Sequence, residues 1–256
     1  MHEIWFESGG TRLFAVESGD GLPILLFHGG LATHLACQRF AAPLAARFRL
    51  VTPDLRCSGR SIHAGDLTWD QLADDVAALV RHLGVGPAVI GGTSFGAGAA
   101  VAAALRHPDV VAGLLILNPA YGGAELGLTP AQQAAMDAMD AAGRRAVAEG
   151  VQVLLPLFDA LPEEMRDRAR AIVAGYDAAS VAASTRFMAS GAQPFARGEA
   201  LAAIAAPTLL VPGTDPTHPA QVAEVYRRHL PRCMVRAVDV DGYAAAIADF
   251  IEQELG

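Results

Sequence analysis

Residues 88–107, AVIGGTSFGAGAAVAAALRH, contain the pattern that decides the fold of this chain. An apolar run, AVIG, leads into the turn GTSFG at residues 92–96, and an alanine-rich helical segment follows at once. The small glycines of a GxSxG turn permit a sharp strand-to-helix corner that holds the serine hydroxyl clear of the backbone. The stretch predicts a buried strand, a tight turn and a helix, with Ser94 as a candidate nucleophile. The alternative is a glycine-rich turn that only packs, and the strand before it and the helix after it disfavour that interpretation.

Short apolar runs recur on both sides of this stretch and alternate with helical segments. They lie at residues 12–18, 23–29, 48–54, 88–94, 113–119, 207–215 and 234–240. Most are rich in Val, Ile and Leu without polar alternation, as expected for strands buried on both faces of a parallel sheet. The clearest helix is at residues 67–84, with Thr68 as its N-cap and Gly84 at its end. The alternation predicts an α/β fold, with a mostly parallel sheet and helices on both faces.

The alternation stops between Tyr121 and Ala200, where the pattern becomes helical. We interpret residues 121–199 as a helical cap inserted between two strands, and residues 1–120 together with 200–256 as the core domain. Such an insertion can be a lid over the active face or a structural appendage. The lid is favoured, because the insertion leaves from the carboxyl end of a strand, where ligands bind in open α/β sheets.

Composition narrows the classes of function. The chain has 256 residues, 52% of them hydrophobic and 18% charged, with a net charge of −8, which predicts an acidic globular protein without a nucleic-acid partner. Its first ten residues carry two glutamates and no basic, apolar leader, so we expect a cytoplasmic location. Residues 83–105 have no charge, but several glycines and a proline interrupt them, and we predict no membrane span.

The sequence gives no indication of a metal or an organic cofactor. Cys37, Cys57 and Cys233 are an odd number without CxxC spacing, which predicts reduced thiols rather than disulfides or a zinc site. Residues 84–89, GVGPAV, imitate a dinucleotide fingerprint but follow a helix and lack its third glycine. Neither a GK[ST] phosphate loop nor an HExxH motif occurs.

Several segments together resemble the α/β-hydrolase family over nearly the whole chain. They are HGG at residues 28–30, DLRCSGRS at 54–61, the GTSFG turn, the helical insertion and PTLLVPGTD at 207–215. The resemblance implies an α/β-hydrolase fold in which the backbone amides of Gly30 and Phe95 form the oxyanion hole. It also implies that Asp215 orients a catalytic histidine. Cys57 departs from the family pattern, where glycine is common, and packing is its favoured role.

The family's catalytic histidine usually follows the last strand as Gly-His. The equivalent dipeptide here is Gly242-Tyr243, and residues 238–250 contain no histidine. A tyrosine with an ordinary pKa of about 10 is a poor base at neutral pH. The usual position of the general base is therefore vacant.

His218 is the leading candidate for the missing base. It lies three residues after Asp215, on a loop flanked by prolines and next to the one that normally carries the histidine. Asp215 would support it, or alternatively Asp239 or Asp241. The competing interpretation is that His218 only caps the helix that follows.

Seven other histidines remain. We expect His28, His34 and His63 to reach the active face as pocket residues, with His28 shaping the oxyanion loop, and each is a less favoured base. Surface or capping roles suit the others, which are His2, His82, His107 and His229.

Together these features predict a cofactor-free serine hydrolase that cleaves small-molecule carboxylic esters through a Ser94 acyl-enzyme. Apolar cap residues would form a pocket for small to medium acyl groups, or equally the cap's own core: Met136, Met139, Leu154, Leu157, Phe158, Phe187 and Met188. Two other interpretations keep the same fold, namely a binding protein and a non-hydrolytic enzyme such as a lyase. The intact serine turn and HGG loop favour a hydrolase. Nothing in the sequence indicates an oligomeric state.

Overall fold

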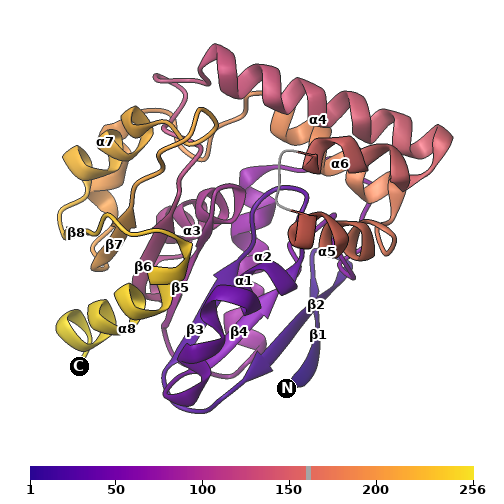
Figure 1. The fold of residues 1–256 in the computed structure, drawn as a ribbon. Helices are drawn as coiled ribbons and strands as arrows, with labels where there is room; N and C mark the ends of the chain where they lie inside the picture. Colours follow the sequence, from indigo (N-terminus) through magenta and orange to yellow (C-terminus); the bar gives the residue numbers. More distant parts are fainter. Residues whose placement is uncertain (160–162) are drawn as a thin grey trace.

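A single eight-stranded sheet organises the chain (Figure 1), in the order β1-β2-β4-β3-β5-β6-β7-β8. The computed structural model describes residues 1–159 and 163–256; residues 160–162, which fall within the predicted cap, lie outside the described residues. β1 pairs with β2 and β2 with β4 in antiparallel fashion, and every other pairing is parallel. The strands are β1 (His2–Ser8), β2 (Thr11–Ser18), β3 (Pro23–Phe27), β4 (Arg49–Pro53), β5 (Ala88–Thr93), β6 (Val111–Leu117), β7 (Thr208–Val211) and β8 (Cys233–Val235). The predicted mostly parallel α/β sheet is confirmed.

The strands depart from the sequence predictions at the two edges of the sheet. β1 was not among the predicted runs, because only three consecutive residues of its sequence HEIWFES are apolar; it is the antiparallel edge strand of the sheet. At the other edge, the run predicted at 234–240 is a strand only as far as Val235. β8 pairs with the short β7 alone, and Asp239 then begins the 3₁₀ turn η5 (Val240–Gly242) by accepting a hydrogen bond from the Gly242 amide.

Helices cover both faces of the sheet. One face carries α2 (Trp69–His82), α3 (Phe95–Arg106) and α7 (Ala220–His229), and the other carries α1 (His34–Ala41) and α8 (Tyr243–Glu254). The predicted N-cap of the clearest helix is confirmed, because the Thr68 hydroxyl accepts a hydrogen bond from the Gln71 amide. Short 3₁₀ segments complete the core at η1 (Ala42–Ala46), η2 (Pro108–Val110) and η4 (Gly198–Ala203).

The segment between β6 and β7 contains helices joined by turns and loops, and no strand among its described residues, and it gathers over one end of the sheet (Figure 1). Its elements are α4 (Pro130–Glu149), η3 (Val151–Phe158), α5 (Glu163–Val173) and α6 (Ala178–Ala189). Five of its residues form a small apolar cluster of their own, which is Ala142, Ala146, Leu154, Val173 and Val181. We call residues 121–199 the cap segment. Because it packs on its own cluster, it can hold its shape while resting on the core.

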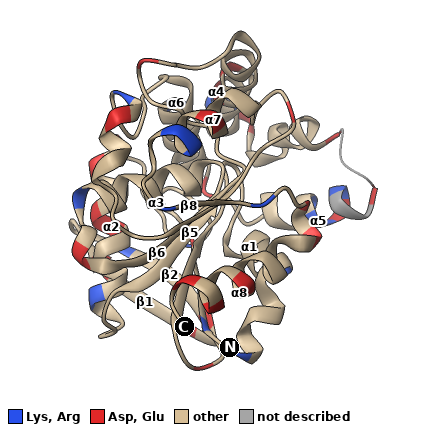
Figure 2. Cartoon of the chain, turned by 90° about the vertical axis from the view of Figure 1, so that its left-hand side faces the viewer, with Lys and Arg blue, Asp and Glu red and all other residues tan. Residues whose placement is uncertain are grey.

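Charge lies mainly on the outer helices and loops, where acidic and basic residues are interspersed (Figure 2). The sequence contains no lysine, so every basic residue in that view is an arginine. Within residues 1–159 and 163–256, no helix has the length and apolar character needed to cross a membrane. The uncharged stretch that begins at residue 83 instead forms β5 and the buried helix α3.

A buried ion pair ties the loop after β4 to α2 and to the first hairpin. Arg56 is 1% exposed and donates to both carboxylate oxygens of Asp75, over 2.9 Å from Nε and 2.6 Å from Nη2. The same guanidinium donates to the Ser8 carbonyl oxygen over 2.9 Å and to the Thr11 hydroxyl. Burial raises the pKa of Asp75 and the Arg56 hydrogen bonds oppose that shift, so the carboxylate depends on its partner to remain charged.

We predict that Arg56→Met destabilises the fold by about 3–5 kcal/mol, because it leaves the Asp75 carboxyl buried without its partner. Urea unfolding at neutral pH measures the change. The control is Arg81→Met, which breaks the exposed Arg81–Asp109 pair and should leave the midpoint almost unchanged. Equal effects of the two substitutions would contradict the prediction.

Candidate active site

Ser94 stands at the corner between β5 and α3 with a backbone φ of 52°. A positive φ is strained for a residue other than glycine, and here the surrounding packing imposes it. A Cβ on Gly92 would lie 2.4 Å from the Phe27 carbonyl oxygen, and one on Gly96 would lie 2.3 Å from the same atom. The end of β3 therefore presses directly on the corner, and only glycines at these two positions leave room for it.

His218 lies between Ser94 and Asp215 in the arrangement that general-base catalysis needs. Its Nε2 is 2.9 Å from Ser94 Oγ, and its Nδ1 is 2.8 Å from Asp215 Oδ2. Because a carboxylate only accepts hydrogen bonds, Nδ1 carries the proton and Nε2 is free to accept one from the serine hydroxyl. The structure thus brings together the three residues that the sequence proposed as nucleophile, base and acid.

Asp215 is built to remain ionised. Burial alone would raise its pKa, but hydrogen bonds from Thr217 and His218 outweigh that effect and lower the pKa to about 2. Oδ1 accepts from the Thr217 amide over 2.8 Å, from the Thr217 hydroxyl over 2.6 Å and from the His218 amide over 3.1 Å. These bonds leave Oδ2 to hold the imidazole.

The loop that carries both residues folds back tightly on itself. A Cβ on Gly213 would lie 2.3 Å from both the Cβ and the carbonyl oxygen of His218. The next helix, α7, begins after Pro219 and has no side-chain capping hydrogen bond, so His218 does not act as its cap. The side chain of His218 points instead toward Ser94.

The position that the family usually gives to histidine has a packing role here. Tyr243 is 5% exposed, and its ring meets Phe40 edge-on with centroids 5.3 Å apart. Burial is the main reason that the pKa of the Tyr243 phenol is raised, and the negative charges of Asp215 and Asp239 raise it further. Asp239 caps η5 rather than supporting His218. Asp241, the remaining alternative acid, is exposed on η5.

Ser94 and His218 open into a cavity of about 320 Å³ beneath the cap segment. Among the apolar residues predicted for a pocket, Met136, Met139 and Met188 line it. Leu154 lies in the cap's own cluster, with Leu157 and Phe158 packed against it, and Phe187 packs against Trp69 and Phe95. Other lining residues had no signal in the sequence, because distant segments supply them: Asn118, Ala120, Tyr121, Gln132, Ala135 and Thr217. Among the described lining residues, none is charged.

Both residues proposed for the oxyanion hole line this cavity beside Ser94. Phe95 is the first residue of α3, and Gly30 follows β3 in the HGG loop. A Cβ on Gly30 would come within 2.6 Å of Met188 Sδ, so the cap segment closes over this loop. The Leu31 carbonyl accepts a 2.6 Å hydrogen bond from the hydroxyl of Tyr176, which is a second tie between the loop and the cap segment.

The three histidines expected in the pocket lie elsewhere, and none lines the cavity among the described residues. His28 is fully buried, donates from Nδ1 to the Gly29 carbonyl over 2.7 Å and accepts at Nε2 from the Leu55 amide over 3.1 Å. Burial lowers its pKa, which keeps the ring neutral. Nδ1 of His34 donates to Asp54. Nδ1 of His63 lies 3.3 Å from the Thr11 hydroxyl, and the backbone amide of His63 donates to the Ser180 hydroxyl.

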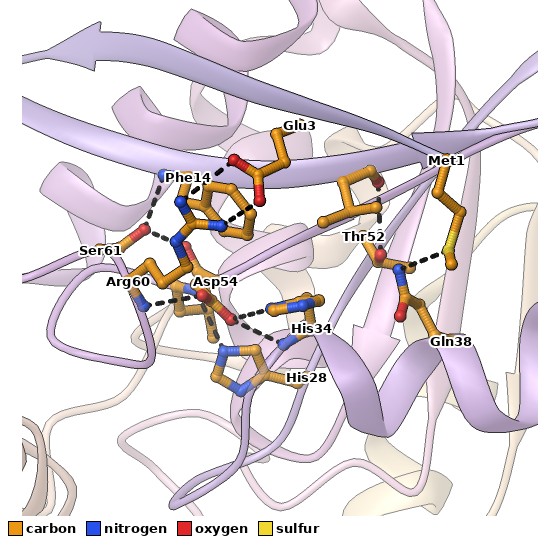
Figure 3. A network of polar contacts seen from close by, with 12 residues as sticks. Met1, Glu3, Phe14, His28, His34, Gln38, Thr52, Asp54, Arg60 and Ser61 are labelled. Carbon is orange, nitrogen blue, oxygen red and sulfur yellow. Dashed lines mark hydrogen bonds and ion pairs between the residues drawn. The ribbon is translucent and has the colours of Figure 1, made fainter. Parts of the chain in front are cut away.

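Asp54 is the centre of a polar cluster beside the HGG loop, in which it bonds to His34 and Arg60 (Figure 3). Its Oδ1 accepts from the amide and from Nδ1 of His34, over 2.7 Å and 2.8 Å, and its Oδ2 accepts from the Arg60 amide over 2.8 Å. Arg60 in turn stacks on Phe14, with its Cζ 3.9 Å from the ring centroid, and pairs with Glu3. Burial tends to raise the pKa of Asp54, but the His34 hydrogen bond and the nearby histidines lower it overall.

The described residues hold no group of three or more His, Cys, Asp or Glu side chains that could bind a metal ion. All three cysteines are free thiols, and the sequence predicted them as such. Burial raises the pKa of Cys57 to about 12, so this thiol, in the segment after β4, remains protonated and unreactive at neutral pH.

Comparison with known proteins places this site in context. A family model described as alpha/beta hydrolase fold matches residues 23–246. Proline iminopeptidase of Neisseria gonorrhoeae is 32% identical over 122 residues, which are 45% of this chain and 36% of that protein. Lipase LipV of Mycobacterium tuberculosis is 37% identical over 122 residues, covering 46% of this chain and 44% of that protein. The matched region thus spans less than half the length of these curated relatives.

Solved structures match over a larger part of the chain. A thermophilic esterase from Thermogutta terrifontis is similar with a TM-score of 0.81 and 23% identity, covering 100% of both chains. The epoxide hydrolase CorEH has a TM-score of 0.80 at 19% identity, covering 98% of this chain and 99% of that one. At these identities the likeness shows the shared fold.

We predict that Gly96→Ala destabilises the protein, because the added Cβ would lie 2.3 Å from the Phe27 carbonyl oxygen and 2.6 Å from that of His28. Thermal unfolding measures the loss. Gly86→Ala is the matched control, since nothing lies within 4 Å of a Cβ at that exposed glycine. An unchanged melting temperature for Gly96→Ala would contradict the close packing of β3 on the corner.

The lowered pKa of Asp54 predicts a pH dependence of stability. An acid whose folded-state pKa is depressed stabilises the fold above its unfolded pKa, about 4, and this contribution disappears as the pH falls through the folded value. Asp54→Asn should therefore weaken the fold at pH 6 and flatten the decline in stability between pH 5 and pH 3. Urea unfolding across that range is the measurement, and parallel curves for the two proteins would contradict the prediction.

Proposed function

This chain belongs to the alpha/beta hydrolase fold family, and from that premise we propose that it is a serine hydrolase that cleaves carboxylic esters through an acyl-enzyme on Ser94. The observation that carries the proposal is the imidazole of His218, which contacts Ser94 Oγ on one side and Asp215 on the other. A positioned base beside a serine hydroxyl is what activates this weak nucleophile. A binding protein would have no use for that arrangement.

The first half of the reaction forms the acyl-enzyme. As Ser94 Oγ attacks the ester carbonyl carbon, its proton passes to His218 Nε2 and the carbonyl electrons move onto oxygen. The amides of Gly30 and Phe95 stabilise that oxyanion, an effect typically of about 3 kcal/mol per donor. The tetrahedral intermediate then collapses, and the imidazolium gives its proton to the departing alkoxide, which leaves as the alcohol.

In the second half of the reaction, water takes the place of the serine hydroxyl as the nucleophile. A water molecule loses its proton to His218 Nε2 as it attacks the acyl carbon, and the second intermediate collapses to the acid while the proton returns to Ser94 Oγ. Asp215 remains ionised throughout, since its pKa is lowered to about 2, and it stabilises each transient imidazolium.

The cavity favours uncharged substrates with compact acyl groups. Its described lining combines methionines and alanines with a few neutral polar groups, and its volume of about 320 Å³ lies at the small end for ligand pockets. A substrate with a cationic amine would meet no carboxylate among the described lining residues. We assign residues 121–199 the role of a lid that supplies the apolar side of the pocket.

Acyl transfer suits Ser94 better than displacement at an alkyl carbon. A haloalkane dehalogenase from Mycobacterium tuberculosis is among the relatives, at 31% identity over 116 residues. Displacement of a halide by Ser94 would leave a serine ether, which has no carbonyl for water to attack. An acylated serine has one, so His218 can complete the cycle.

We predict that Ser94→Ala and His218→Ala each lower the hydrolysis of p-nitrophenyl butyrate by about a thousandfold or more, because nucleophile and base act as one unit. Release of p-nitrophenolate measures the rate. His2→Ala removes an exposed histidine far from the site and should retain wild-type turnover. Wild-type rates in His218→Ala would show that another group is the base.

Two further outcomes separate this function from the other classes. Failure of a fluorophosphonate probe to label Ser94 in the wild type would favour a binding protein. Product acid formed in ¹⁸O-water without the heavy isotope would favour a non-hydrolytic reaction.

A further inference from the structure

Gln132 connects the cap segment to the loop that carries His218. It lies in the first turn of α4, is fully buried and lines the cavity. Its Nε2 donates to the Thr217 carbonyl over 3.0 Å and to the Ala120 carbonyl over 2.7 Å. Its Oε1 accepts from the Thr129 amide over 3.0 Å, so every atom of the side-chain amide has a defined partner.

The loop around His218 has few other anchors. The bonds that Asp215 accepts all come from Thr217 and His218, two and three residues further along the same loop. These bonds set the shape of the loop but do not fix it relative to Ser94. Among the described residues, Gln132 is the one side chain outside residues 212–219, apart from Ser94 itself, that hydrogen-bonds to the loop.

This connection matters because base and acid share one loop. When histidine and aspartate lie on separate loops, a shift in one leaves the other in place. Here a displacement of residues 215–218 moves both groups away from Ser94 together. A misplacement of about 1 Å in a reacting group can cost about a hundredfold in rate.

We propose that Gln132 is a positioning residue for His218, so that the first turn of α4, in the cap segment, is part of the proton-transfer apparatus. The proposal rests on the function proposed above. It assigns to the cap segment a role beyond covering the pocket, because the Thr217 carbonyl reaches its partner only while α4 is seated on the core. Two other roles for Gln132 predict different results: contact with the substrate would change KM, and simple capping of α4 would act through Thr129.

The test compares Gln132→Met with Gln133→Met in p-nitrophenyl butyrate hydrolysis. Gln133 is the matched control, since its Nε2 also donates to a backbone carbonyl, that of Ala189, but within the cap segment. We expect kcat to fall about 10- to 100-fold in Gln132→Met with KM within about twofold. Gln133→Met should retain both constants. Gln132→Asn, whose amide is one methylene too short to reach Thr217, should reproduce the kcat loss if the methionine variant folds poorly.

A double-mutant cycle identifies the group through which Gln132 acts. In a His218→Ala background, Gln132→Met should cause no further loss, because the residue to be positioned is absent. Thr129→Ala removes the capping hydroxyl but leaves the bond to Thr217, and its kcat should stay near the wild-type value.

Three results would overturn the proposal. They are a rise in KM at unchanged kcat, equal losses in Thr129→Ala and Gln132→Met, and losses that multiply in the His218→Ala background. The proposed function fails separately, if wild-type hydrolysis does not exceed that of Ser94→Ala.

Discussion

The close approach of the β3 backbone to the corner between β5 and α3 is the constraint on which the site depends. The Phe27 carbonyl oxygen occupies the space that side chains at residues 92 and 96 would need. That contact holds Ser94 at a positive φ, and it brings the HGG loop, which continues from β3, directly beside the nucleophile. Parallel pairing of Phe27 with Gly92 makes the approach possible, because the carboxyl ends of neighbouring strands then meet at the same edge of the sheet. Nucleophile and oxyanion loop are thus placed by a single backbone contact.

Two polar clusters keep the segments behind that contact in place. Asp54 and His28 hold the loop after β4 against the HGG loop, through His34 and through the Leu55 amide. One residue further on, Arg56 and Asp75 anchor the same segment to α2. Each of the two clusters pairs charged or polar groups whose burial without a partner would be costly. The hydrogen bonds therefore fix the joined loops more firmly than apolar contacts would. The histidines among them are therefore structural, although their place in the sequence pointed toward the pocket.

The other half of the site shows how a fold can supply the same geometry from a different segment. The end of β7 leads into a loop that turns back on Gly213 and presents His218 to Ser94, while Tyr243 fills the position after β8 with an apolar ring. Because Asp215 lies three residues from His218, local hydrogen bonds orient the imidazole. The relation of this loop to the rest of the molecule then depends on the cap segment, through Gln132.

Sequence alone determined the features that arise from local chemistry. The apolar runs specified the parallel strands, since a strand buried on both faces needs apolar residues throughout. The glycines of GTSFG specified the corner, since a close backbone carbonyl oxygen excludes side chains at residues 92 and 96. It also limited the search for a base to a few histidines. Only the tertiary structure decided among them, because whether His218, His34 or His63 faces Ser94 depends on loop paths that no periodicity encodes. The same holds for Gln132 and Asn118, which line the cavity with Ser94 because the fold brings together segments distant in the chain. Strands and turns depend on residues that are adjacent in the sequence, whereas an active site consists of residues that become neighbours only when the chain folds.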